Sequence, residues 1–136
     1  MPERVLVDGL GYECTPRSEE DLVSGLAEID TAARDRGEPV LATIYASATD
    51  DTPPSLGIGL GADDSVLVYD AGDWSGEGSF SKGSRTGDTT EFAFRYGTAV
   101  NEYLGWMLIP KDAAYAAAQE FFRTGQQPTI VEWGDI

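Results

Sequence analysis

Apolar side chains recur every three or four residues in one long segment near the start of the chain. They form the stripe Leu22, Leu26, Ile29 and Ala33. This spacing places them on one face of an α-helix. Ser18 precedes the segment as a capping residue, three carboxylates occupy the first turn, and Gly37 stands where a left-handed cap is common. The pattern predicts a helix over Glu19–Arg36.

A second helix is predicted near the end of the chain. Pro110 suits a first helical turn, where its missing N–H removes no hydrogen bond. Five alanines occupy residues 113–118, and Phe121 continues the run. Thr124 and Gly125 end the helix.

Shorter runs alternate with a period of two, which is typical of half-buried strands. The clearest is a hairpin in which residues 56–60 and 66–68 flank a turn over residues 61–64. Further strands are predicted at residues 4–7, 12–14, 40–46, 91–96, 106–109 and 129–133. Residues 97–105 fit no single pattern, and residues 72–88 are rich in glycine and serine and predict a long loop.

The order of these elements predicts the α+β class. We expect one mainly antiparallel sheet with two helices packed on one face. The length of 136 residues fits a single domain over residues 1–136.

Charge narrows the possible partners. Twenty-four acidic residues face nine basic ones, for a formal net charge of -15. A free nucleic-acid binder needs cations for the phosphates, and an anionic membrane repels such a chain, so neither partner is expected. A basic protein would be attracted and its approach accelerated, although acidity can also serve solubility alone.

Residue types also limit the chemistry. The chain has no histidine, and Cys14 is its single cysteine. Ser-His-Asp and Cys-His catalysis, an internal disulfide and a thiolate zinc cluster are therefore excluded. We predict no cofactor and no metal. No signal peptide or membrane-length apolar run is visible, so the cytoplasm is the expected location, with leaderless export left open.

Short motifs give no convincing active site. Residues 79–82 match the bare S-x-x-K pattern, and residues 57–61 resemble a dinucleotide loop, but no helix is predicted at either place. Close packing of strands explains those glycines better. Two carboxylate pairs could serve glycoside hydrolysis, although in so acidic a chain such pairs arise by chance. They are Asp63 with Asp64 and Asp70 with Asp73.

The charge distribution is more informative than the motifs. No lysine or arginine occurs between Arg36 and Lys82, a stretch that contains eight carboxylates. Its glycine-rich part also carries aromatic side chains, which could supply buried area at an interface or could fold back onto the core. The candidate partner-binding residues in this stretch are Asp70, Asp73, Trp74 and Glu77, followed by Asp64 and Phe80.

The end of the chain carries a family resemblance. Alanine-rich residues 113–118 lead into Glu120-Phe121-Phe122, Thr124-Gly125, Pro128 and Val131-Glu132-Trp133. This resembles the closing signature of the Imm1 family of bacterial immunity proteins, in which a helix ends in aromatic-x-x-Gly and a proline and a short strand ending in tryptophan follow. The hairpin and the glycine-rich loop agree with it. Glu132 is the signature residue that packing explains least, so it joins the candidates.

The resemblance implies a cytoplasmic antidote, encoded beside a polymorphic toxin that often has a nucleic-acid deaminase fold. Such a protein binds its cognate toxin domain and blocks it without catalysing a reaction. An acidic chain could occupy a basic substrate groove in place of phosphates. Two other hypotheses stay open: a small enzyme that uses carboxylates in a deep pocket, and an acidic adaptor or nucleic-acid mimic that binds a basic host protein.

Overall fold

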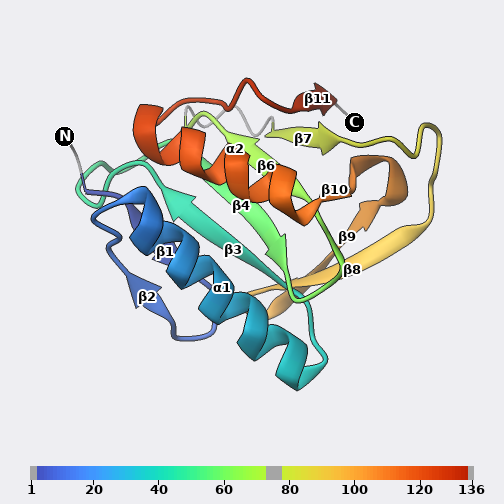
Figure 1. Ribbon diagram of the computed structural model, residues 1–136, viewed down its shortest axis with the longest axis horizontal. Helices are drawn as coiled ribbons and strands as arrows, with labels where there is room; N and C mark the ends of the chain where they lie inside the picture. The colour runs from blue at the N-terminus through green and yellow to red at the C-terminus, as the bar shows by residue number, and fades with distance from the viewer. Residues whose placement is uncertain (1–2, 73–77, 135–136) are drawn as a thin grey trace.

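Two helices cover one face of a mainly antiparallel sheet, as Figure 1 shows for the computed structural model. The structure describes residues 3–72 and 78–134. The predicted α+β class, with its mainly antiparallel sheet, is confirmed. In chain order, the described elements are β1 (Val5–Val7), β2 (Glu13–Cys14), α1 (Glu19–Arg36), β3 (Val40–Tyr45), β4 (Ser55–Leu60), β5 (Asp64–Ser65), β6 (Leu67–Asp70), β7 (Gly78–Lys82), β8 (Glu91–Tyr96), β9 (Ala99–Leu104), the 3₁₀ turn η1 (Gly105–Met107), β10 (Ile109–Pro110), α2 (Lys111–Thr124) and β11 (Glu132–Gly134).

Both helices end where the sequence predicts because their ends are capped. The Ser18 hydroxyl accepts the N–H of Asp21 at 3.0 Å, which satisfies one free donor at the start of α1. Gly37 follows α1 with a φ of 68°, and Gly125 follows α2 with a φ of 69°, a left-handed conformation that side chains disfavour. The buried side of α1 contains the whole predicted stripe.

The strands of the sheet follow the order β11-β7-β6-β4-β3-β1-β2, and the predicted hairpin is the antiparallel pair β4–β6. Strand β8 joins the sheet through a single parallel pair near its end, Val40 with Arg95, and it pairs along its length with β9 in an antiparallel hairpin. In Figure 1 this hairpin crosses behind the sheet, on the side away from the helices.

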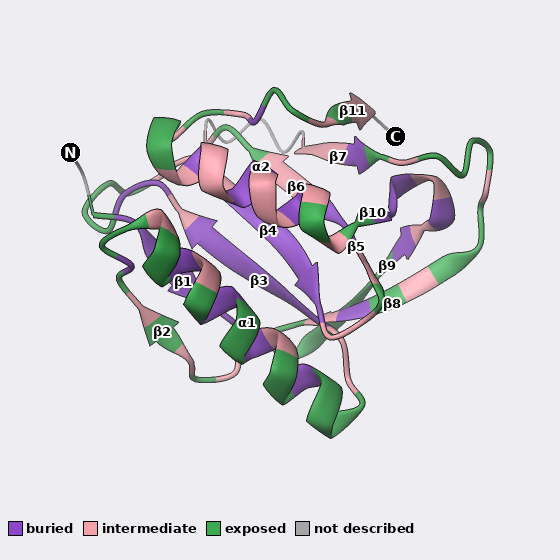
Figure 2. Cartoon of the chain, in the orientation of Figure 1, coloured by how far each residue is buried: buried purple, intermediate pink, exposed green. Residues whose placement is uncertain are grey.

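The central strands β3 and β4 are buried along almost their whole length (Figure 2). Their buried side chains divide between two clusters, so the core has two parts. The larger part lies between the sheet and the helices and includes Ile44, Ile58 and Phe121. The smaller part lies between the other face of the sheet and the β8–β9 hairpin. It contains Leu41, Val66, Phe94, Tyr103, Met107 and Leu108.

Some sequence predictions for the second half of the chain are wrong. The predicted loop over residues 72–88 contains strand β7. Residues 97–105, for which the sequence predicted no element, contain strand β9. Residues 106–109 are not one strand, because η1 turns the chain so that Met107 can enter the second core. The last strand begins later than predicted. The indole N–H of Trp133 donates to the Pro128 carbonyl at 2.8 Å, which folds the preceding residues back as a loop.

Candidate partner-binding site

The face of the sheet away from the helices, here called the open face, carries small side chains at its centre. Strand pairing brings Thr43 of β3 opposite Gly57 of β4, and Gly57 opposite Val68 of β6. One row further along, the same pairing brings Tyr45 opposite Ser55, and Ser55 opposite Asp70. The side chains across Thr43, Gly57 and Val68 are therefore short, and the neighbouring row of paired residues includes the carboxylate of Asp70.

Only part of the open face is covered. A Cβ atom on Gly59 would lie 2.7 Å from the Phe94 ring, so the glycine lets the β8–β9 hairpin pack directly on β4. Close packing thus explains Gly59. At the next glycine on that face, Gly57, the three atoms nearest to the Cβ position belong to the Leu41 side chain. The β8–β9 hairpin therefore covers the sheet at Gly59 but not at Gly57.

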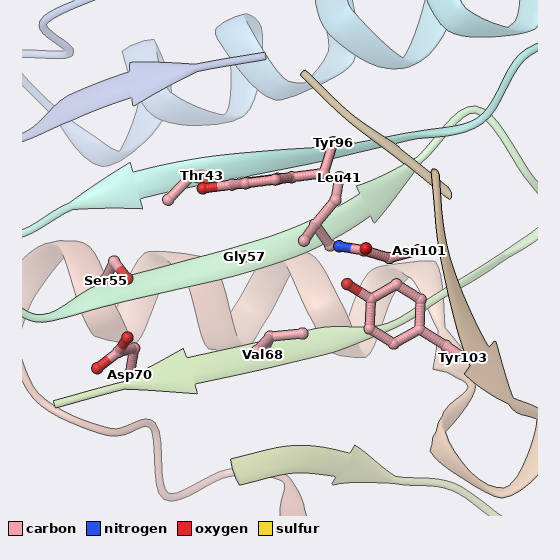
Figure 3. A pocket seen from close by; sticks show the side chains of 9 residues that line it. All are labelled: Leu41, Thr43, Ser55, Gly57, Val68, Asp70, Tyr96, Asn101 and Tyr103. Atoms are coloured by element: carbon pink, nitrogen blue, oxygen red, sulfur yellow. The ribbon is translucent and has the colours of Figure 1, made fainter. Parts of the chain in front are cut away.

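A hollow of about 200 Å³ results at Gly57. Figure 3 shows Asp70 and Ser55 at one end of it, and Tyr103 and Asn101 at the other. The residues that line it come from five strands and are Leu41, Thr43, Ser55, Gly57, Val68, Asp70, Tyr96, Asn101 and Tyr103. Small-molecule sites usually measure about 300–1,000 Å³, so this hollow suits a single side chain better than a substrate.

Tyr96 and Tyr103 line the hollow, and Tyr45 is paired with Ser55 of its lining. Burial, and then the neighbouring Tyr96 hydroxyl, raises the pKa of Tyr45 to about 12. Burial likewise raises the pKa of Tyr103. Tyr96 is 43% exposed and forms the outer rim. Among the described residues that line the hollow, Asp70 is the one with a carboxylate, so it supplies the charge of the hollow.

Asp70 has no cationic partner among the described residues. One of its oxygens, Oδ1, accepts the backbone N–H of Gly72 at 2.8 Å, which closes a tight turn. No lysine or arginine in the described ranges lies within 4.0 Å of it. Its side chain is exposed, and its charge is available to a partner.

The anionic stretch between Arg36 and Lys82 divides into two ends. Glu38, Asp63 and Asp64 lie where β3 begins and β4 ends, and each pairs with an arginine from outside the stretch. These partners are Arg95 at 2.6 Å, Arg34 at 3.5 Å and Arg85 at 2.9 Å, respectively. This end of the sheet is electrostatically compensated.

The opposite end is not compensated within the described part of the chain. Asp50 and Asp51 are exposed in the loop before β4, and Asp70 ends β6. The loop before β4 and the residues that follow β6 are neighbours, because a Cβ atom on Gly72 would lie 2.3 Å from the Thr52 carbonyl oxygen. We call Asp50, Asp51 and Asp70 the acidic end.

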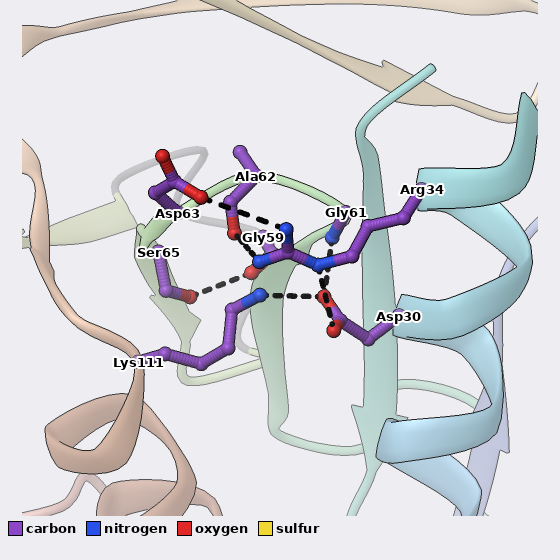
Figure 4. Close-up of polar contacts among 8 residues, drawn as sticks. All are labelled: Asp30, Arg34, Gly59, Gly61, Ala62, Asp63, Ser65 and Lys111. Carbon is purple, nitrogen blue, oxygen red and sulfur yellow. Dashed lines mark hydrogen bonds and ion pairs between the residues drawn. The ribbon is translucent and has the colours of Figure 1, made fainter. Parts of the chain in front are cut away.

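A polar network holds the helices to the compensated end (Figure 4). The Asp30 carboxylate of α1 accepts from Lys111 Nζ of α2 and from the Gly61 N–H, both at 2.6 Å. Arg34 adds a bond to Asp30 at 3.2 Å and one to the Ala62 carbonyl at 2.8 Å. Burial disfavours the charged form of Asp30, but these donors outweigh it and the pKa of Asp30 lies below its usual value. The network serves the fold.

The structure separates the predicted site residues. Asp70 borders the hollow, whereas Asp64 pairs with Arg85 at the other end of the sheet. Phe80 lies on β7 and packs on Tyr103 with ring centroids 6.3 Å apart, so it folds back onto the second core. Glu132 is exposed on edge strand β11, opposite Lys82. Asp73, Trp74 and Glu77 lie outside the described residues.

Sequence reasoning missed most of the hollow. The available signal was the alternation of Ser55, Gly57 and Gly59 with large apolar residues, which marks a strand that is thin on one face. Tyr96 and Asn101 gave no signal, because only the crossing of the β8–β9 hairpin brings them to the open face.

The other geometry gives little support to catalysis. A second hollow, of about 500 Å³, is lined by Lys82, Gly83, Thr86, Gly87, Trp106 and Gly134, none of which is a carboxylate. Among the described residues, no group of three or more possible metal ligands gathers. No described helix is long and apolar enough to cross a membrane.

Comparison with known proteins assigns a family to this fold. The family described as immunity protein Imm1 matches residues 11–135, nearly the whole chain. The chain belongs to the Imm1 family. A comparison with curated proteins found no match.

The family gives the site its context. Membership of a family of immunity proteins indicates that this Imm1 protein neutralises a toxin and that the toxin is its partner. The match begins after β1, so the shared part of the Imm1 fold includes both helices, the hollow and the acidic end.

Proposed function

We propose that this Imm1 protein binds the catalytic domain of a cognate polymorphic toxin of the nucleic-acid deaminase type and occludes its substrate groove. The acidic end and the adjoining residues Asp73, Trp74 and Glu77 would form the centre of the interface. The protein would meet the toxin in the cytoplasm, where leaked or incoming toxin reaches nucleic acid.

The uncompensated acidic end is the observation that carries this proposal. Within the described residues, five of the nine basic side chains pair with carboxylates outside the acidic end. None of the described lysines and arginines forms an ion pair with the carboxylates of the acidic end. A toxin that acts on nucleic acid needs a basic groove for phosphates. Carboxylates can occupy that groove, and their field accelerates the encounter.

The decisive experiment uses the toxin domain encoded beside this protein. Purified toxin and immunity protein are mixed at moderate salt and separated by size, and deamination of a nucleic-acid substrate is measured with and without the immunity protein. We expect a stoichiometric complex with an interface of about 1,600 Å², nanomolar or tighter affinity, and loss of toxin activity. Absence of a complex would refute the proposal, and a complex that leaves the toxin active would refute occlusion.

A charge reversal tests the placement of the interface. Asp51→Lys alters the acidic end, and Asp35→Lys makes the same change at an exposed position on α1. We expect Asp51→Lys to slow association at least tenfold at low salt and to lose most of this effect at high salt, because screening weakens exposed charges. Asp35→Lys should change association less than threefold. Equal effects of both variants would contradict this placement.

A further inference from the structure

The hollow of the open face has a shape and a charge that the proposed function does not by itself explain. Gly57 and Val68 form its floor in neighbouring strands, and Asp70 stands one row further along β6. Residues two apart on a strand are separated by about 7 Å. The hollow is therefore a trough with an apolar floor and a single carboxylate at its end.

We infer that this trough receives one arginine side chain of the toxin, with the guanidinium at Asp70 and the aliphatic stem over Gly57 and Val68. The inference rests on the proposed function and names the contact at its centre. The bond from the Gly72 N–H uses Oδ1 of Asp70, so within the described residues Oδ2 is available to such a partner. Carboxylate–guanidinium bonds are short and charge-assisted, and are stronger than neutral hydrogen bonds.

The walls of the trough favour arginine over a compact ammonium group. Leu41 and Val68 offer apolar contact to the methylenes. Tyr96, at 43% exposure, can lie over a planar cation, and guanidinium groups stack on aromatic faces more readily than ammonium groups do. Ser55, opposite Asp70, adds a hydroxyl acceptor beside the carboxylate.

Glycine at position 57 keeps the trough open. The three atoms nearest to its Cβ position are side-chain atoms of Leu41, 3.1–3.5 Å away. A larger residue therefore requires a small shift of Leu41 and fills the floor of the trough. At Gly59 the Phe94 ring already occupies the equivalent space. Gly57, which the hairpin leaves uncovered, thus lies where the aliphatic part of the proposed arginine would pass.

The test compares affinities for the cognate toxin domain by surface plasmon resonance. Asp70→Asn removes the charge with little change of shape, Gly57→Val fills the floor without changing charge, and Asp35→Asn is a charge-matched control on α1. We expect Kd to rise 10–100-fold for the first two variants and less than threefold for the control. Thermal melting checks that each variant folds. Asp70→Asn alone decides the matter if Gly57→Val does not fold.

A second measurement separates failure of this inference from failure of the proposed function. Amide chemical shifts of the full chain are followed during titration with N-acetyl-arginine methylamide, with the citrulline analogue as a neutral control. We expect saturable shifts at Gly57, Val68 and Asp70 that the citrulline analogue and the Asp70→Asn variant do not show. Toxin binding that both variants leave unchanged would overturn the inference while the function stands. Absence of saturable shifts at the trough would overturn it even if no toxin binds.

Discussion

The Asp30 network predicts a measurable loss of stability when its charge is removed. Asp30→Asn keeps the shape of the side chain and one acceptor oxygen, but it replaces the ion pair with Lys111 by a bond from a cation to a neutral amide, and it makes the bond from Gly61 neutral. Hydrogen bonds to charged groups contribute about 1.5–3 kcal/mol and neutral ones about 0.5–1.5 kcal/mol. Both side chains of the ion pair are largely buried, with 15% and 20% of their surface exposed. We therefore expect a loss of about 2 kcal/mol.

This loss of unfolding free energy corresponds to a decrease in melting temperature. An unfolding entropy of about 2.1 cal/mol/K per residue gives about 0.29 kcal/mol/K for the whole chain, so 2 kcal/mol lowers Tm by about 7 °C. Circular dichroism melts at pH 7 measure it. Asp35→Asn on the same helix is the control, because it relieves the same general repulsion in an acidic chain without touching the network.

The pH dependence gives the same reasoning a second test. The pKa of Asp30 is lower in the folded state than in the unfolded state, so its contribution is fully present above the unfolded pKa of about 3.9. The contribution is lost as pH falls through the lower, folded pKa. The difference in Tm between wild type and Asp30→Asn should shrink below about pH 4. A difference under 2 °C at pH 7, or one that stays constant down to pH 2, would refute the reasoning.

Three further outcomes follow from packing and burial. Phe121→Ala should lower the free energy of unfolding by about 4 kcal/mol in urea titrations, because this ring is fully buried in the larger core. Gly59→Val should cost about 1–3 kcal/mol because its side chain meets the Phe94 ring, whereas Gly57→Val should cost clearly less; equal losses would contradict this packing. Burial raises the pKa of Tyr45 to about 12, above the unfolded value near 10. The stability it contributes is present below pH 10 and is lost as pH rises to about 12, so Tyr45→Phe should melt with a weaker dependence on pH in this range.

The sequence predicts correctly those helices and strands that are determined by residues close to them in the chain. Helix α1 begins and ends as predicted because Ser18 and Gly37 act on their own turn of backbone. The hairpin of β4 and β6 follows from alternation on both sides of a short turn. Strand β7 was mistaken for a loop because its glycine and serine residues carry no periodic apolar signal. It forms because β6 and β11 supply hydrogen-bond partners on both sides.

The sequence by itself determined the α+β class, the caps of the helices, the absence of histidine chemistry and an acidic surface suited to a basic partner. The tertiary structure decided which carboxylates remain free. Asp64 and Asp70 look alike in sequence, yet Arg85 folds against the first, and no described lysine or arginine pairs with the second. Ion pairs and hollows join residues far apart in the chain, such as Asp70 and Tyr96. Their formation depends on strand register and on where the β8–β9 hairpin crosses the sheet, and no local pattern encodes that crossing.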